Sequence, residues 1–131
     1  MLNMIEYKRY EFMIKVFFNN EKDEGIMVNF KLGENNLHLD FEKVTFFEKL
    51  EEKKKVVVHG VDEEIIINAT LRDIEDKLGK NFYKCHKNFL VNIDNIADVD
   101  KENRIVKMNN NDQCIVGERH LNKLLRILNA D

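Results

Sequence analysis

Proline is absent from the 131-residue sequence, and only five glycines and two cysteines occur. This scarcity excludes a collagen-like chain and a Pro/Gly-rich chain of low complexity. No apolar run approaches the length of a membrane span, and no charged-then-apolar leader with a small-residue cleavage site opens the chain. We therefore expect one soluble, cytoplasmic domain with no membrane partner, large enough to bury its own core.

Patterns typical of catalysis or metal binding are missing as well. Cys85, His86, Cys114 and His120 are too scattered for a zinc site, because neither CxxC nor HxxxH spacing occurs. The chain has no Gly-rich phosphate loop, no GxSxG elbow and no convincing carboxylate pair. The adjacent Cys85 and His86 do not make a catalytic dyad, since neighbouring side chains on a strand point apart. We expect neither an enzyme nor a cofactor or metal.

Charge is distributed unevenly along the chain. The formal net charge of −3 argues mildly against a nucleic-acid partner, because nucleic-acid-binding domains tend to be basic. Between Lys80 and Ile93, however, no acidic residue occurs, and this stretch carries Lys84, His86 and Lys87. Phosphate contacts act within a Debye length of roughly 8–10 Å, so the local sign matters more than the sum. This segment is well suited to an anionic partner.

Alternation of apolar and polar residues predicts short strands separated by polar turns. The predicted strands are residues 26–32, 37–41, 44–47, 53–58, 63–68, 96–99, 104–108 and 113–116, with 59–62 as a connector. A helix is predicted over residues 71–78, with Thr70 as its N-cap and Gly79 at its end, and a second over 121–128. Residues 4–19 fit either a helical stripe or a strand. The pattern indicates a mostly β, mainly antiparallel domain.

The basic stretch can be read as a strand in which Phe82, Lys84 and His86 face one way and Tyr83 and Cys85 the other. The alternation is clean only after Asn88. We therefore expect residues 84–88 to form a strand entrance or a loop.

The segment His86-Lys87-Asn88-Phe89-Leu90-Val91-Asn92 resembles the motif of the LytTR DNA-binding domains. The similarity extends to Phe46-Phe47-Glu48, Thr70-Leu71-Arg72-Asp73-Ile74-Glu75, Ile96, Arg104-Ile105-Val106 and Arg119. It is strongest to the output domain of accessory-gene-regulator response regulators of Gram-positive quorum sensing. It covers roughly residues 25–131, and it implies an elongated stack of small sheets that grips DNA with loops. Residues 1–24 are then a linker or an N-terminal extension.

The resemblance implies three base contacts, each with a simpler interpretation beside it. Lys54 lies where the family has a base-reaching loop residue, although a charge run such as 53–55 is usually a solvated turn. Lys87 lies at the major-groove position, although an exposed lysine needs no partner. Arg119 matches the family's reading arginine, and a bidentate Arg–guanine contact is the commonest specific contact. Glu118 places a negative charge beside it.

Contacts to the DNA backbone are expected from four further residues, His86, Asn88, Arg104 and Lys123. His86 is alternatively a hydrogen-bonded histidine at a strand edge, and Arg104 supports either a phosphate contact or the fold. Asn88 and Gly117 replace serines that are usual in the family. Asn92 is expected to cap a turn rather than to touch DNA.

The two cysteines form a possible redox pair. The simpler interpretation of Cys85 and Cys114 is two small buried thiols that fill the core. The related quorum-sensing regulators carry cysteines at matching positions, which implies that the two strands bring them together. A bond between them would displace Lys87 and Arg119 slightly and weaken DNA binding.

We expect a sequence-specific double-stranded DNA-binding domain, the output module of a bacterial transcription regulator in a two-component system. The family implies two copies on direct repeats about one helical turn apart, and a possible upstream receiver domain. The alternative is a LytTR-like protein-interaction module that does not bind DNA, which the acidic net charge and Glu118 favour.

Overall fold

Eight strands form one hydrogen-bonded sheet in the computed structural model, which describes residues 9–18, 24–32, 35–61, 64–78 and 81–129. Their order across the sheet is β3-β2-β1-β6-β5-β4-β8-β7. Among the described strands only the β1–β6 pair is parallel. The strands are β1 (Arg9–Phe18), β2 (Glu24–Leu32), β3 (Asn35–Asp40), β4 (Val44–Lys49), β5 (Lys55–Gly60), β6 (Glu64–Asn68), β7 (Phe82–His86) and β8 (Phe89–Asn92).

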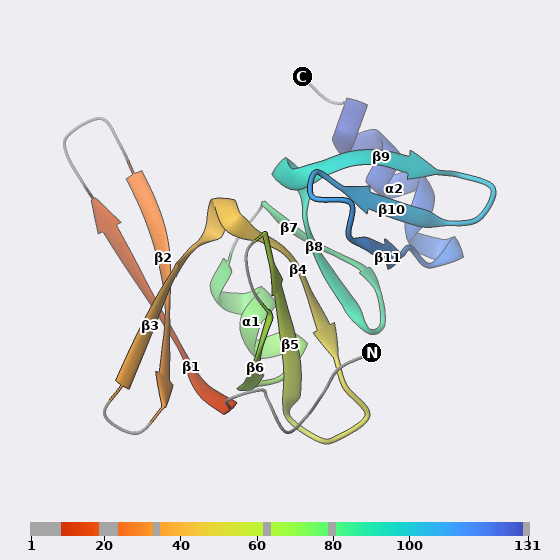
Figure 1. Cartoon of the computed structure of the whole chain (residues 1–131). Helices are drawn as coiled ribbons and strands as arrows, with labels where there is room; N and C mark the ends of the chain where they lie inside the picture. The colour runs from red at the N-terminus through yellow and green to blue at the C-terminus, as the bar shows by residue number, and fades with distance from the viewer. Residues whose placement is uncertain (1–8, 19–23, 33–34, 62–63, 79–80, 130–131) are drawn as a thin grey trace.

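A second sheet and a helix complete the C-terminal part. The sheet has the strand order β11-β10-β9 and lies with the last helix beside β7 and β8, whereas β1, β2 and β3 lie at the other end of the large sheet (Figure 1). The remaining elements are η1 (Phe41–Lys43), α1 (Leu71–Leu78), η2 (Ile93–Asn95), β9 (Ile96–Asp100), β10 (Ile105–Met108), β11 (Gln113–Ile115) and α2 (Glu118–Asn129).

The predicted fold class is confirmed: the domain is mostly β, mainly antiparallel, with two α-helices in the described part. Each predicted strand is present. For residues 4–19 the sequence left helix or strand open, and the structure has a strand at residues 9–18. This strand pairs with β2 and with β6, so it belongs to the same sheet as the rest. The boundary between residues 24 and 25 stays a prediction, and Gly79 lies outside the described residues.

Several predicted boundaries are wrong; residues 53, 54 and 104, for example, lie in turns rather than in strands. Residues 59 and 60 continue β5 instead of opening a connector, because the buried His59 ring lies between two carboxylates on neighbouring strands. Its Nε2 is 2.8 Å from Oε1 of Glu48 and its Nδ1 is 3.4 Å from Oε1 of Glu64. The last helix begins at Glu118 rather than at residue 121, so the segment expected to be a loop is a first helical turn.

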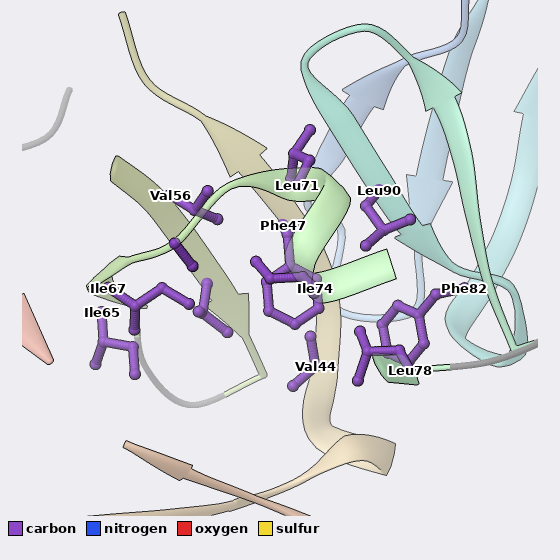
Figure 2. Packing of buried hydrophobic residues seen from close by; sticks show 12 residues of the cluster. Val44, Phe47, Val56, Ile65, Ile67, Leu71, Ile74, Leu78, Phe82 and Leu90 are labelled. Atoms are coloured by element: carbon purple, nitrogen blue, oxygen red, sulfur yellow. The ribbon is translucent and has the colours of Figure 1, made fainter. Parts of the chain in front are cut away.

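The helix α1 has the predicted cap and packs on one face of the large sheet. The backbone N–H of Asp73 donates to Oγ1 of Thr70 at 3.1 Å, as the capping pattern requires. Leu71, Ile74 and Leu78 are buried on one side of α1. Figure 2 shows them against a core from five strands, whose other labelled members are Val44, Phe47, Val56, Ile65, Ile67, Phe82 and Leu90. This face of the sheet we call the α1 side.

The opposite face of β4 and β8 carries a second core. Phe46 pairs with Val91 and Phe47 with Leu90, so alternate residues of the same two strands bury on opposite sides. The second core joins β4 and β8 to the small sheet and α2. Its buried members are Phe46, Cys85, Val91, Val106, Met108, Cys114, Val116 and Leu124. We call this face the α2 side. Because both faces are covered, the central strands are apolar almost throughout.

The basic stretch forms a hairpin of β7 and β8 with residues 87 and 88 at its turn. A bulge between Lys84 and His86 shifts the register, so that His86 lies opposite Phe89. The predicted placement of His86 on the same face as Lys84 is therefore wrong. His86 stacks near Phe89, with ring centroids 5.5 Å apart, and turns to the α2 side.

Candidate nucleic-acid interface

Two hydrogen bonds hold the turn of the β7–β8 hairpin at Asn88. The N–H of Asn88 donates to Nδ1 of His86 at 3.0 Å, and the carbonyl of Asn88 accepts from the N–H of Lys49 at 2.8 Å. Lys87 between them is exposed. At the end of β8, the side chain of Asn92 caps η2 by accepting from the N–H of Asp94 at 3.1 Å, as predicted. The exposed lysine thus projects from a rigid backbone.

The hydrogen bond from Asn88 determines which His86 nitrogen carries the proton. Since Nδ1 is an acceptor, Nε2 carries the hydrogen in the neutral ring and can donate outward. Burial of the ring, followed by the positive charges of Lys87 and His120, lowers the pKa of His86 from its ordinary value. At neutral pH this histidine is therefore a neutral, oriented donor.

The β4–β5 loop holds Lys54 in an unusual backbone conformation. Its φ is 56°, in the left-handed region that few non-glycine residues adopt. The carbonyl of Lys54 accepts from the N–H of Ala69 at 3.0 Å, and the carbonyl of Lys55 accepts from the N–H of Leu50 at the same distance. These bonds close the loop and attach its tip to the segment that leads into α1. The Lys54 side chain is exposed.

Between this loop, the start of α1 and β7 lies a groove of about 400 Å³. We call it the α1 groove. It is lined by Lys49, lysines 53–55, Lys84, Lys87 and Arg72, together with Ala69, Thr70 and Leu71, and none of its lining residues is acidic. The structure thus brings Lys54 and Lys87, which are far apart in sequence, to one surface feature.

A second groove, of about 530 Å³, lies between the hairpin and the start of α2. We call it the α2 groove. It is lined by Lys84, His86, Lys87, Gly117, Glu118, Arg119 and His120, so it shares Lys84 and Lys87 with the α1 groove. Arg119 is exposed in the first turn of α2. A smaller groove of about 320 Å³ places Asn88 beside Lys87, Lys49 and Glu51.

Gly117 allows α2 to approach the hairpin closely. Its N–H donates to the carbonyl of Cys85 at 2.6 Å. A methyl group at this position would lie 3.2 Å from Cδ2 of His120 and 3.9 Å from Cδ2 of His86, and the first distance is too short without a shift. A side chain at position 117 would therefore require the His120 ring to shift.

Tyr83 joins α2 to β7. Its hydroxyl lies 3.2 Å from Nδ1 of His120, and burial and then the neighbouring Cys85 raise the pKa of Tyr83. Nζ of Lys123 lies 5.7 Å from the centre of the Tyr83 ring, within range of a cation–π contact. Lys123 follows Arg119 by one helical turn, so both lie on one face of α2.

Arg104 is separate from this arrangement. It ends the turn between β9 and β10 with a φ of 54°, and its carbonyl accepts from the N–H of Val116 at 2.9 Å. It is not among the residues that line the three grooves described above. Its backbone supports the small sheet, and its phosphate contact stays a prediction.

The sequence interpretation missed Lys49 and Arg72 as members of the basic surface. Both line the α1 groove. Lys49 ends a strand and Arg72 begins a helix, positions at which an exposed cation is ordinary. Their shared surface arises only because β4 pairs with β8 and α1 packs across the sheet.

The two cysteines lie close enough for their thiols to interact. Both are free and buried, and the Cys85 thiol beside that of Cys114, followed by burial, raises the pKa of Cys114. Sγ of Cys85 is also 3.5 Å from the carbonyl of Ile115. A protonated, buried thiol reacts slowly with oxidants. Redox activity of the pair stays a prediction.

Two further features are absent from the described residues. Within those ranges, no group of three or more His, Cys, Asp or Glu side chains is placed to hold a metal ion. No helix of the described chain has the length and apolar character needed to cross a membrane.

Comparison with known proteins agrees with the predicted resemblance. The model of the LytTr DNA-binding domain matches residues 34–129. Accessory gene regulator protein A of Staphylococcus aureus (strain N315) is 27% identical over 104 residues, which cover 79% of this chain and 43% of that protein. The protein of the same name from Staphylococcus epidermidis is 26% identical over 97 residues, which cover 74% of this chain and 40% of that protein. The chain spans less than half the length of these curated relatives.

Among solved structures, the LytTr DNA-binding domain of a Bacillus cereus DNA response regulator superposes with a TM-score of 0.65. The sequence identity is 24%, and the match covers 78% of this chain and 94% of that one. At this identity the comparison establishes the shared fold.

Proposed function

Because the chain belongs to the LytTR family of DNA-binding domains, we propose that it reads double-stranded DNA sequence-specifically as the output domain of a bacterial transcription regulator. The observation that carries this proposal is the position of Lys87. It lines both the α1 groove with Lys54 and the α2 groove with Arg119, so the three candidate base contacts follow one continuous basic surface.

The side chains on this surface suit different parts of DNA. Lys87 projects from a fixed turn and Arg119 from the first turn of a helix, and both types donate to guanine in the major groove. Lys54 adds a third base contact from the β4–β5 loop. His86 donates from Nε2 to a phosphate, and Asn88, Lys123 and Arg104 set the register on the backbone.

Two copies on direct repeats about one helical turn apart, roughly 34–36 Å, form part of the proposal. The names of the Staphylococcus relatives, together with the fraction of their length that the chain covers, support a role in a quorum-sensing response regulator with an upstream receiver domain. In that setting the receiver would control whether two output domains lie side by side on DNA.

The test is selection of a preferred duplex from a random pool, followed by binding titrations across a salt series. We expect a preferred duplex bound at least about 1,000-fold tighter than a scrambled one. The logarithm of the association constant should fall linearly with the logarithm of salt concentration. A chain that binds no duplex at low salt would indicate the protein-interaction module instead.

A further inference from the structure

The α1 groove contains more cations than the three base contacts need. Besides Lys54 and Lys87 it is lined by Lys49, Arg72 and Lys84, to which no DNA contact has been assigned so far. No acidic side chain lines this groove, although the chain as a whole is acidic. Like charges brought together at one concave site repel one another, so an anion in the groove would be stabilising.

These cations have no carboxylate partners in the described part of the chain. The ion pairs there join His59 to Glu48 and to Glu64 on the α2 side. Within the described ranges, Lys55 is the only groove lysine with a side-chain partner, the neutral amide oxygen of Asn68. Lys49, Lys84 and Arg72 therefore remain available to an external anion.

The start of α1 adds to the positive potential of this groove. Leu71 and Arg72 line it, and they occupy the first turn, where backbone N–H groups have no acceptor within the helix. Thr70 already satisfies the N–H of Asp73. The positive end of the helix dipole lies at this same end of α1, where the carboxylate of Asp73 in the first turn offsets part of it.

The walls of the α1 groove are also held in fixed relative positions. The bond from the N–H of Ala69 to the carbonyl of Lys54 joins the loop to the start of α1, and the bond from Lys49 to Asn88 joins β4 to the hairpin turn. The cations therefore lie on backbones that need not rearrange when an anion binds.

We propose that the α1 groove is a second phosphate-binding site, in which Lys49, Arg72 and Lys84 hold the DNA backbone beside the bases read by Lys87 and Arg119. This inference rests on the proposed function. Lysines and arginines that bind phosphate contact a group that is identical in every DNA sequence. Their contribution is therefore the same for every sequence, and it widens the contact region toward α1.

The experiment compares the double variant Arg72→Gln/Lys84→Gln with the wild-type chain on a preferred and on a scrambled duplex. Each lost phosphate contact lowers the salt slope by about 0.9 and affinity at 0.1 M salt by roughly tenfold. We expect affinity to fall by roughly 100-fold on both duplexes, with their ratio unchanged. Lys49→Gln alone should lower both by roughly tenfold, which tests the groove at a residue outside α1 and β7.

The matched control is Lys101→Gln/Lys107→Gln, which removes two exposed cations from the β9–β10 hairpin. It removes the same number of positive charges as Arg72→Gln/Lys84→Gln, but neither changed residue lines the α1 groove. A melting curve for each variant shows that it is folded. Salt slopes equal to those of the control, or a loss confined to the preferred duplex, would overturn the inference while leaving DNA binding intact. A wild-type chain that binds no duplex would overturn this inference and the proposed function together.

Mapping of phosphates by ethylation interference locates the site independently. With the wild-type chain, ethylation should interfere with binding at phosphates that flank the protected bases. These signals should disappear with Arg72→Gln/Lys84→Gln. Interference signals that persist in this variant would contradict the inference.

Discussion

The two grooves that meet at Lys84 and Lys87 differ in the side chains that line them. The α1 groove is lined by lysines and one arginine, with no acid among them. The α2 groove contains two imidazole rings, an arginine and a glutamate. Lysines supply charge without direction, whereas arginine and an oriented histidine supply hydrogen bonds of defined geometry. We conclude that the additional cations of the α1 groove are suited to affinity, whereas Arg119 in the α2 groove is suited to reading.

The two sides are also built differently. The α1 side follows simple alternation and a capped helix, both of which tolerate change at exposed positions. The α2 side depends on a bulge after Lys84 and on the close contact at Gly117. Small displacements of the backbone on the α2 side should therefore affect sequence preference more than overall affinity for DNA.

The largest effect should come from removing the core beneath the α1 groove. Ile74 is fully buried between α1 and the sheet, so Ile74→Ala leaves a cavity. We expect the free energy of unfolding to fall by about 2–5 kcal/mol, measured by urea denaturation. Asp76→Ala on the exposed side of the same helix should change it by less than about 0.5 kcal/mol. Equal losses in the two variants would mean that α1 does not pack as described.

Next in size is the loss of the reading arginine. Arg119→Ala should weaken binding to the preferred duplex by about 1–3 kcal/mol and relax the preference at one base position. The measurement is a competition titration against duplexes substituted one position at a time. A uniform loss on all duplexes would instead identify Arg119 as a phosphate contact.

The two lysines shared by the grooves are expected to play different roles. Lys87→Ala should cost more than Lys84→Ala on the preferred duplex, because Lys87 contacts a base while Lys84 contacts phosphate. Lys84→Ala should weaken preferred and scrambled duplexes alike, by roughly tenfold at 0.1 M salt. Equal losses from both variants on both duplexes would remove the distinction between the two lysines.

Oxidation of Cys85 and Cys114 should change the α2 side, because both cysteines belong to the core there. A bond between Cys85 and Cys114 would shift Gly117 and the hairpin turn, which weakens binding to the preferred duplex by roughly 1 kcal/mol, the smaller cost of a lost base contact. Binding to scrambled DNA should change less, and reductant should restore both. The check is a thiol count after mild peroxide, with binding measured before and after. Cys85→Ser should not respond. Two thiols that stay free would show that the pair only fills the core.

The smallest effect should be the pH dependence that His86 contributes to stability. Its folded pKa lies below the value near 6.5 of an unfolded chain, so the unfolded state takes up the proton first as pH falls. The stability contribution is present above about pH 6.5 and is lost as the pH falls from there to the lowered folded pKa. Unfolding titrations of the parent and of His86→Gln between pH 5 and 8 should diverge in this direction. Parallel curves would contradict it.

Much of the framework was predictable from local pattern. Alternation indicated the strands from residue 26 onward, and the spacing of Thr70, Asp73 and Leu78 predicted α1 and its cap. The motif from His86 to Asn92 predicted the family. These features depend on residues a few positions apart, and such contacts are determined by the geometry of a single strand or helix.

The start of α2 and the orientation of His86 were not predictable in this way. Glu118 and Arg119 are helical because Gly117 bonds to Cys85 on a strand more than thirty residues earlier. His86 turns to the α2 side because β8 pairs with β7 across a bulge. Neither partner is visible in the local sequence.

The sequence by itself determined the kind of domain, the positions of its strands and the candidate cations Lys54, Lys87 and Arg119. Tertiary structure alone decided that these cations share one surface, that Lys49 and Arg72 join them, and that His86 is a neutral donor. The physical reason is that local geometry orients a side chain on its own element. A charged groove, in contrast, forms only where pairing of distant strands places several such elements edge to edge.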